Sequence, residues 1–300
     1  MAIRYSHENG VMMSKLIIIT VCYKSNPALL SLAFSLNSQE IKPWKWILID
    51  NAPLSNPALD LKTTFPIQIV SGNEGDGFGA GCNAGLELID EINFDGWVWL
   101  LNPDTDLPSN NHIENLLNTL SDFDKNTILG TAIEDLDHQL EPSAGWIHKG
   151  LGYRKSQVTR QSLNQIGRSD VEVDWVSGCN LIFCPSSFST PLRFDDYFPL
   201  YFEDIDFCLR AKLQGGKCVW LHSLTVSHKK STGSECSLFR RERLKTISQI
   251  HFLYRYQPWW VVVAHSLRIA TKALHGLPTK STASQGMLCG VFQALLNHRA

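Results

Sequence analysis

Two carboxylates one residue apart, Asp104 and Asp106, follow an apolar run at residues 97–101. Such a run predicts a buried strand, so both acids are expected on the turn after it, which Pro103 restricts. Carboxylates this close repel each other unless a cation lies between them, and a divalent metal meets that demand. His228 is a candidate third ligand, because imidazole often accompanies carboxylates at a metal. The alternatives are an ordinary solvated turn and a surface histidine.

A glycine-rich stretch at residues 73–83 offers a second kind of chemistry. It reads Asn-Glu-Gly-Asp-Gly-Phe-Gly-Ala-Gly-Cys-Asn and lies between a predicted strand and a predicted helix. Glycines let backbone N–H groups approach and hold a phosphate. A dinucleotide-binding loop is one alternative, since Gly75, Gly77 and Ala80 fit the relaxed fingerprint, and a tight turn without ligand is another. The dinucleotide alternative is disfavoured because Asp95, the acid about 20 residues on, precedes a strand instead of ending one.

Glu203 and Asp204 begin a predicted helix directly after an aromatic turn. Acids at a helix N-terminus commonly act as caps. Aromatic neighbours would also exclude water and raise the proton affinity of a carboxylate, as a general base requires. Both explanations are open at this point. For Asp206 and Arg210, the spacing of four residues predicts a simple ion pair.

The elements that must position these residues alternate between strand and helix. Apolar runs predict strands at residues 15–22, 46–49, 67–70 and 97–101, and helices between them at about 26–38 and 80–92. This alternation predicts a doubly wound α/β sheet. Ligands bind past the carboxyl ends of strands in such sheets, and Asp50, Asn73 and Asp104 all fall at such ends.

The second half of the chain continues the α/β pattern less regularly. We expect a helix at 109–120 capped by Ser109, strands at 128–133, 171–175, 181–184 and 217–221, and a helix at 203–214 ended by Gly215 and Gly216. Residues 135–170 are predicted to be an irregular insertion or lid. Residues 1–14 are predicted to be a flexible leader.

Composition and charge restrict the classes of protein to which the chain can belong. With 44% hydrophobic and 19% charged residues, the chain is predicted to be globular. The eight cysteines form no Cys-x-x-Cys pair and most lie in apolar runs, which indicates core residues in a reducing compartment. No run reaches the roughly 20 apolar residues of a membrane-spanning helix, and the first apolar run is too short for a signal peptide. We therefore expect a cytoplasmic protein.

The net charge of −2 is the sum of an acidic body and a basic tail. In residues 237–300, apolar side chains recur at helical spacing at Trp259, Val263, Leu267, Ala270 and Leu274. A second stripe is polar and basic: His265, Arg268, Lys272 and His275. This predicts an amphipathic helix that either lies on an anionic membrane surface, with Trp259 and Trp260 at headgroup level, or packs on the body.

Taken together, these residues resemble the family 2 glycosyltransferases, most closely the rhamnosyltransferase-like members of surface-polysaccharide assembly. The matching segments are 18–23, 48–51, 73–85, 100–106, 174–178, 201–210 and 226–228. The resemblance implies a GT-A fold at residues 15–236, a Rossmann-like mixed sheet with helices on both faces, followed by a helical extension at 237–300. It also implies an inverting enzyme that uses Mn2+ or Mg2+ and a nucleoside diphosphate sugar.

The resemblance further implies a role for individual residues. Asp204 would be the catalytic base, and Asp104, Asp106 and His228 the metal ligands. The donor would contact Asp50, Asn73, Gly79, Asn83 and Asp104; the acceptor would contact Trp175, Gly178 and Glu203.

The chain departs from the family pattern at Lys24, where asparagine is usual, at Ala52-Pro53 after the second strand, and in the longer loop at residues 74–77. These departures leave the identity of the donor base open.

The predicted function is transfer of a sugar, rhamnose being one candidate, to a hydroxyl of a glycan or lipid-linked acceptor. The same residues are compatible with two alternative functions. A sugar nucleotidyltransferase would need a basic triphosphate-binding loop near the N-terminus, and Lys24 and Lys42 are poor candidates for such a loop. A nucleotide-sugar-binding protein that lacks catalysis is the other. No nucleic acid partner is expected, and the enzyme would be peripheral on the inner face of the membrane.

Overall fold

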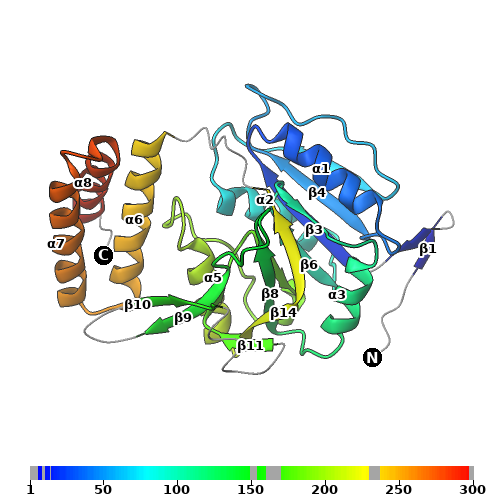
Figure 1. Cartoon of the computed structure of the whole chain (residues 1–300). Coiled ribbons are helices and arrows are strands. Elements are labelled where there is room, and N and C mark those ends of the chain that lie inside the picture. The colour runs from blue at the N-terminus through cyan, green and yellow to red at the C-terminus, as the bar shows by residue number, and fades with distance from the viewer. Residues whose placement is uncertain are drawn as a thin grey trace.

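The protein is described by a computed structural model that covers residues 6–8, 11–13, 15–148, 154–159, 170–229 and 237–296. A mixed sheet with helices on both faces forms its body, and three further helices stand beside it (Figure 1). Within the described residues, nine strands make this sheet in the order β11-β14-β8-β13-β6-β3-β4-β5, with β7 paired to β14. The predicted doubly wound α/β sheet is therefore confirmed.

The sheet brings the ends of several strands to one edge. Four strands run parallel: β3 (Leu16–Cys22), β4 (Lys45–Asp50), β5 (Ile67–Ser71) and β6 (Trp97–Leu101). Strand β13 (Asn180–Phe183) runs antiparallel between β6 and β8 (Thr127–Glu134), and β14 (Lys217–His228) runs parallel to β8. Because β13 is reversed, the residues before it lie beside the carboxyl ends of its neighbours.

Alternating side chains of the buried strands supply two separate cores. Ile17 and Ile19 of β3 face one core, while Leu16 and Ile18 face the other. Helices α2 (Phe78–Glu91) and α5 (Glu203–Leu213) pack on the first face, and α1 (Asn26–Asn37) and α3 (His112–Leu120) on the second. A strand buried on both faces needs apolar residues at every position, which explains the continuous apolar run.

Several predicted boundaries were wrong. The helix expected from Ser109 begins at His112 and has Asn111 at its N-cap position. Strand β14 continues past the predicted Leu221 to His228, with an irregular register before Thr225. Residues expected to be irregular include β9 (Ala144–His148) and β10 (Arg154–Gln157), which form a small sheet with β12 (Trp175–Val176). The remainder of that insertion, 149–153 and 160–169, lies outside the described residues.

Short elements complete the body. Strand β7 (Thr105–Asp106) follows the turn after β6, and β11 (Asp170–Val173) forms one edge of the large sheet. Within the predicted leader, β1 (Ser6–Glu8) pairs antiparallel with β2 (Val11–Met13), and the predicted flexibility of this segment stays a prediction.

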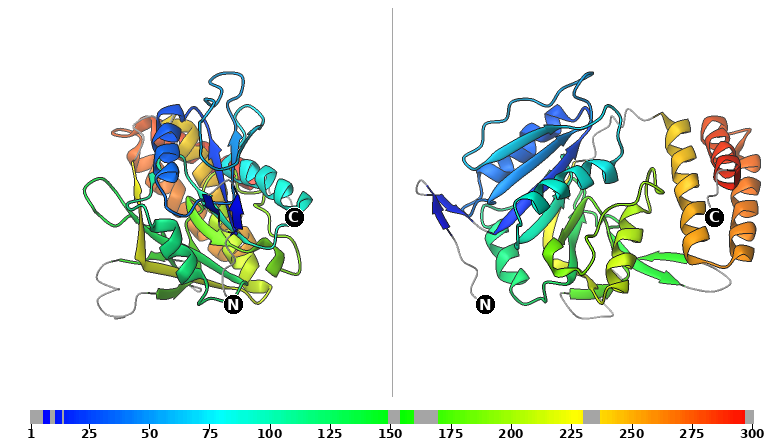
Figure 2. Two further views of the ribbon diagram at one scale, coloured as in Figure 1. Left: turned by 90° about the vertical axis from the view of Figure 1, so that its right-hand side faces the viewer. Right: turned by 180° about the vertical axis from the view of Figure 1, so that it is seen from behind.

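The C-terminal region consists of α6 (Leu238–Tyr256), α7 (Trp259–Gly276) and α8 (Ser281–Leu296), which stand side by side (Figure 2). Helix α6 joins the body directly, since Ile250 and Leu253 belong to the same core as the sheet. Glycines bring α8 close to α6: a Cβ added at Gly286 would lie 2.5 Å from the Phe239 carbonyl oxygen. The region is thus attached to the body through α6.

Helix α7 confirms the predicted helix, but its buried side coincides with neither predicted stripe, since Arg268, Lys272 and His275 of the basic stripe are exposed. The buried side is made of Val261, Val262, His265, Ser266, Ile269 and Ala273. His265 is 8% exposed, so its assignment to a solvated basic stripe was wrong. The predicted apolar stripe faces solvent instead, with Trp259 75% and Leu267 63% exposed. None of the helices in the described ranges is both long and apolar enough to cross a membrane.

Candidate active site

Asp104 and His228 meet at the edge of the sheet. Asp104 lies on the turn after β6, and His228 is the last residue of β14. His228 Nε2 lies 3.2 Å from Asp104 Oδ1, and its Nδ1 lies 3.1 Å from Glu141 Oε2. The hydrogen bond to Asp104 raises the pKa of His228, although burial acts in the opposite direction. The sequence predicted that Asp104 and His228 share a site. It did not predict Glu141 as a partner, because Glu141 lies in the stretch predicted to be irregular.

Asp106 is held away from this pair, contrary to the prediction of a shared metal site. Its carboxylate forms an ion pair with Lys229 and accepts hydrogen bonds from Ser31 Oγ at 3.0 and 3.1 Å. The backbone fixes this arrangement because Asp106 on β7 pairs with Ser227 on β14. No group of three or more His, Cys, Asp or Glu side chains within the described ranges has an arrangement that could hold a metal ion.

Two of the three predicted ligands nonetheless fit a divalent cation. Asp104 Oδ1 is buried and lies 3.2 Å from His228 Nε2, so a carboxylate oxygen and an imidazole nitrogen are side by side. Carboxylate oxygen and imidazole nitrogen are donors that Mn2+ accepts. Asp104 and His228 therefore suit a cation shared with a diphosphate, whereas Asp106 would first have to leave Lys229.

Asp204 stands at the start of α5, close to the residues before β13. Its Oδ2 accepts a hydrogen bond from the Gly178 N–H at 3.2 Å, and its Oδ1 accepts one from the Ile205 N–H at 2.8 Å. Residue 178 must be glycine, because an added Cβ would lie 2.8 Å from the Phe78 ring and 3.4 Å from Asp204 Cβ. Gly178 therefore lies beside the proposed base, and its predicted contact with the acceptor stays a prediction.

The turn before α5 is strained. Tyr201 and Phe202 both have positive φ angles, 62° and 69°, which side chains other than glycine rarely adopt. Such strain persists only where surrounding contacts enforce it, and it is common at functional sites. Phe202 takes the N-cap position without a side-chain cap, so the strained turn alone sets the direction in which α5 begins.

Asp206 anchors α5 to the C-terminal region. It is fully buried and accepts hydrogen bonds from Arg210 Nε at 2.7 Å, Arg255 at 2.8 Å and the Tyr256 hydroxyl at 2.7 Å. The predicted pair with Arg210 is confirmed. Arg255 and Tyr256 of α6 were not predicted as partners, because they lie about 50 positions from Asp206 and local spacing cannot indicate such a contact. Arg255 also pairs with Asp195 at 2.8 Å, which fastens the segment before α5.

The glycine-rich loop is held by a residue that the sequence analysis did not assign to the site. Asn51 Nδ2 donates to the Asp76 carbonyl at 3.0 Å and to that of Gly77 at 3.3 Å. Asn73, a predicted donor contact, donates to Asp76 Oδ2 at 2.9 Å within the loop. Gly75 has φ +80°, which explains the need for glycine there.

Three predicted donor residues have structural partners. Asp50 is buried and accepts hydrogen bonds from the Ala52 and Ala58 N–H groups at 2.9 and 2.7 Å. Asn83 both donates to and accepts from the backbone of Phe194 at 2.8 Å. A Cβ added at Gly79 would lie 2.8 Å from Phe194 Cβ. These contacts account for the residue types, and a donor contact at any of them stays a prediction.

Trp175 lies in the core instead of on a surface. Its side chain is 2% exposed and belongs to the core between the sheet and α5. An acceptor could not touch it in this conformation, so the predicted contact would require a rearrangement.

Cys179 connects the two halves of the site. Burial, together with the negative charges of Asp204, Asp104 and Glu141, raises the pKa of its thiol to about 12. Its carbonyl also accepts a hydrogen bond from the Asn102 N–H at 3.0 Å, next to the turn that carries Asp104. The proposed base and Asp104 are therefore both close enough to this thiol for their charges to act on it.

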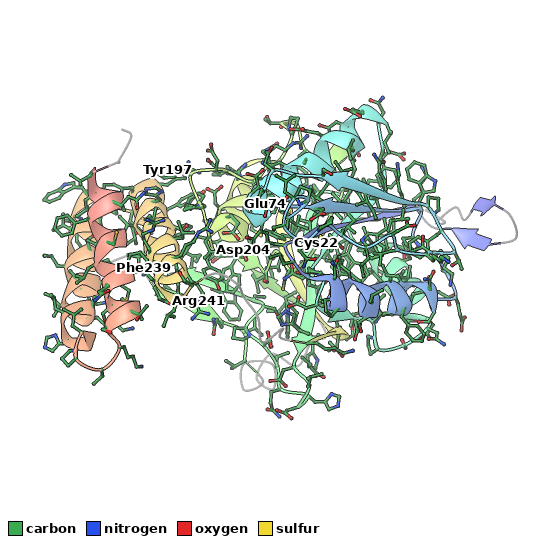
Figure 3. The ribbon with its side chains drawn as sticks, turned by 90° about the horizontal axis from the view of Figure 1, so that it is seen from above. Cys22, Glu74, Tyr197, Asp204, Phe239 and Arg241 are labelled. Carbon is green, nitrogen blue, oxygen red and sulfur yellow. The ribbon has the colours of Figure 1, made fainter. Side chains whose placement is uncertain are left out.

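A cavity of about 540 Å³ adjoins Glu203. Its walls are Tyr23, the stretch between Gly75 and Asn83, the segment from Phe194 to Glu203, and Arg240, Arg241 and Leu244 of α6. In the view from above, Asp204 appears between Arg241 and Cys22 (Figure 3). The cavity thus connects the glycine-rich loop with the C-terminal region.

The chain is similar to known transferases over these elements. The family model of glycosyl transferase family 2 matches residues 17–170. The chain is also 26% identical over 264 residues to the N-acetylglucosaminyl-diphospho-decaprenol L-rhamnosyltransferase of Mycobacterium tuberculosis, which covers 81% of this chain and 85% of that protein.

Two solved structures share the fold. The mannosyltransferase PcManGT from Pyrobaculum calidifontis, in complex with GDP-Man and Mn2+, has a TM-score of 0.51 at 13% identity, covering 95% of this chain and 88% of that one. GalNAc-T7 with UDP, GalNAc and Mn2+ has a TM-score of 0.52 at 12% identity, covering 93% of this chain and 54% of that one. This chain thus spans about half of GalNAc-T7. These similarities confirm the predicted GT-A fold.

Proposed function

This chain belongs to glycosyl transferase family 2, and we propose that it transfers rhamnose from a nucleoside diphosphate sugar to a hydroxyl of a lipid-linked glycan, with inversion. The observation that carries the proposal is the position of Asp204. This carboxylate shares the Cys179 thiol as a neighbour with Asp104, while Glu203 next to it lines a cavity. A proton acceptor close to a diphosphate site is what direct displacement requires.

The chemistry divides between the two halves of the site. Asp204 takes the proton from the acceptor hydroxyl as that hydroxyl attacks the anomeric carbon, and the nucleoside diphosphate leaves on the opposite side. Asp104 and His228 would hold Mn2+ or Mg2+, which when bound supplies Lewis-acid stabilisation of the departing charge. A single displacement needs no enzyme nucleophile, so the buried cysteines of the body have no part in it.

The mycobacterial relative supports a lipid-linked acceptor, because its name specifies a sugar diphosphate on decaprenol. The exposed face of α7 supports delivery from a membrane. Apolar side chains at Trp259, Trp260, Val263, Leu267 and Leu274 are exposed there, together with Arg268 and Lys272. Aromatic and aliphatic groups beside cations are typical of helices that lie on anionic membranes. We propose that α7 rests on the membrane that carries the acceptor.

The test is a transfer assay with purified protein, Mn2+, a panel of nucleoside diphosphate sugars and N-acetylglucosaminyl diphosphate on a short prenyl chain. We expect one donor to raise the melting temperature and to give a disaccharide product with inverted anomeric configuration. Donor stabilisation without any transfer would identify a binding protein instead. Release of inorganic diphosphate from a nucleoside triphosphate and a sugar phosphate would identify a nucleotidyltransferase.

A further inference from the structure

The cavity next to Glu203 has two chemically different ends. Near the body it is lined by carboxylates and aromatic rings, including Asp196, Glu203, Phe198 and Tyr201. Carboxylates accept hydrogen bonds from hydroxyl groups, and aromatic rings present flat apolar faces, so this end suits an uncharged sugar. Its volume of about 540 Å³ lies within the range of small-molecule sites, about 300–1,000 Å³.

The opposite end is basic and belongs to α6. Arg240 and Arg241 both line the cavity at the first turn of this helix. The Arg240 side chain makes no ion pair with any described residue, and the one ion pair of Arg241 is a long contact of 3.7 Å to the adjacent Glu242. Lys245 follows one turn later and lies 6.0 Å from the centre of the Tyr201 ring. Arginines with so few partners can accept an anionic ligand at little cost.

The acids at the cavity do not cancel this basic end. Asp195 is paired with Arg255 at 2.8 Å, and Asp76 accepts a hydrogen bond from Asn73 at 2.9 Å within the glycine-rich loop. Asp195 therefore already has a cation as its partner, from the far end of α6, and Asp76 is held within the loop on the body. The charge of the cavity consequently changes from acidic beside the body to basic beside α6.

We propose that Arg240 and Arg241 bind the diphosphate of a glycosyl diphosphate acceptor, an inference that rests on the proposed transfer to a lipid-linked glycan. Such an acceptor has the same polarity as the cavity: an uncharged sugar at one end and an anionic diphosphate next to it. With the diphosphate on α6, the sugar extends toward Glu203 and Asp204, where its hydroxyl loses the proton. The planar guanidinium groups match phosphate oxygens in pairs, which an ammonium group does not.

The arginine pair also explains why α6 is fastened so firmly to the body. Arg255 near its C-terminal end bridges Asp195 and Asp206, and Ser248 Oγ accepts a hydrogen bond from the Leu200 N–H at 3.2 Å. These contacts link α6 to the segment that carries the acid end of the cavity. The arginine pair is thereby held in place relative to the body end of the cavity.

The proposal is tested by comparing two acceptors that differ only in the diphosphate. One is N-acetylglucosaminyl diphosphate on a short prenyl chain, and the other is a neutral alkyl N-acetylglucosaminide. We expect the KM of the wild type to be lower for the diphosphate acceptor. In the variant R240A/R241A that KM should rise by about tenfold or more, since each tenfold corresponds to about 1.4 kcal/mol and charge-assisted hydrogen bonds typically reach that value. The KM values for the neutral acceptor and the donor should not change.

The matched control is K62A/K217A, which removes two exposed positive charges from the body without touching the cavity. It should behave as the wild type in this membrane-free assay. An equal effect of R240A/R241A on both acceptors, or none on the diphosphate acceptor, would overturn the proposal.

Binding measured without turnover separates this proposal from the proposed function. Calorimetry with the prenyl glycosyl diphosphate in EDTA reports on the arginine pair even if no sugar is transferred. Binding by the wild type that R240A/R241A weakens would support the arginine site, whereas absence of transfer in every donor assay would refute only the function. Equal binding by the wild type and the double variant would refute the arginine site alone.

Discussion

Replacing Asp204 by asparagine tests the assignment of the base most directly. Asn has the size and polarity of Asp but cannot take a proton from the acceptor. General-base catalysis contributes about 10²–10⁴-fold, so kcat should fall by that factor, or about 2.7–5.5 kcal/mol in the activation barrier. One amide oxygen remains to accept the Gly178 N–H, and one of the two backbone hydrogen bonds is lost. The cost in folding stability should therefore be about 1 kcal/mol.

The assay is transfer kinetics beside donor titration by calorimetry. Asp204→Asn should bind the donor as the wild type does, because the proposed donor site consists of Asp104, His228 and the glycine-rich loop. Glu203→Gln is the matched control, since Glu203 is the neighbouring carboxylate and lines the cavity. If Glu203→Gln lost the larger part of kcat, Glu203 would be the base. If Asp204→Asn lost donor affinity but kept its kcat, the division of roles between the two halves would be wrong.

Three further predictions concern the metal, protonation and the membrane. EDTA should abolish transfer and Mn2+ should restore it; full activity after chelation would contradict the metal site. His228→Ala should raise the Mn2+ concentration needed for half-maximal activity more than Asp106→Asn does, because Asp106 is held by Lys229. Burial lowers the pKa of His112 from 6.5 to about 4, so the unfolded chain binds more protons between these values, and the free energy of unfolding should fall by up to about 3 kcal/mol as pH drops from 6.5 to 4. Denaturant unfolding should show a flatter pH dependence in His112→Phe, and an unchanged slope would refute this reasoning. Leu267→Glu should reduce co-sedimentation with anionic vesicles, whereas Leu213→Glu should not, because Leu213 is also exposed but lies on α5. Equal pelleting of both variants and the wild type would argue against α7 as the membrane contact.

Local patterns were enough to predict the body of this protein. Apolar runs such as residues 15–22 and 97–101 specify strands buried on both faces, and the turn residues between them specify where each strand ends. The carboxyl ends of parallel strands meet at one edge, so the neighbourhood of Asp50, Asn73 and Asp104 followed from element order alone. The helix stop at Gly215, with φ +83°, was equally local.

Pairings between distant segments could not be predicted in this way. The spacing of Asp104 and Asp106 indicates a carboxylate pair, but the register of β7 on β14 gives Asp106 to Lys229 and leaves Asp104 beside His228. Glu141 reaches His228 only because its segment folds back along the end of β8. Which partner a carboxylate finds depends on strand register across more than a hundred residues, and no local period encodes it.

The C-terminal region shows the same limit for helices. The period of α7 predicted a helix, and the sequence contains two stripes that could each be buried. Packing against α6 and α8 buried a third face, which includes Val262, His265 and Ile269, and left Leu267 of one stripe and Lys272 of the other exposed. A sequence period specifies that a helix has faces, but the face that is buried is decided by the surface that the neighbouring helices offer. That surface exists only after the chain has folded, since it is built from side chains of separate segments.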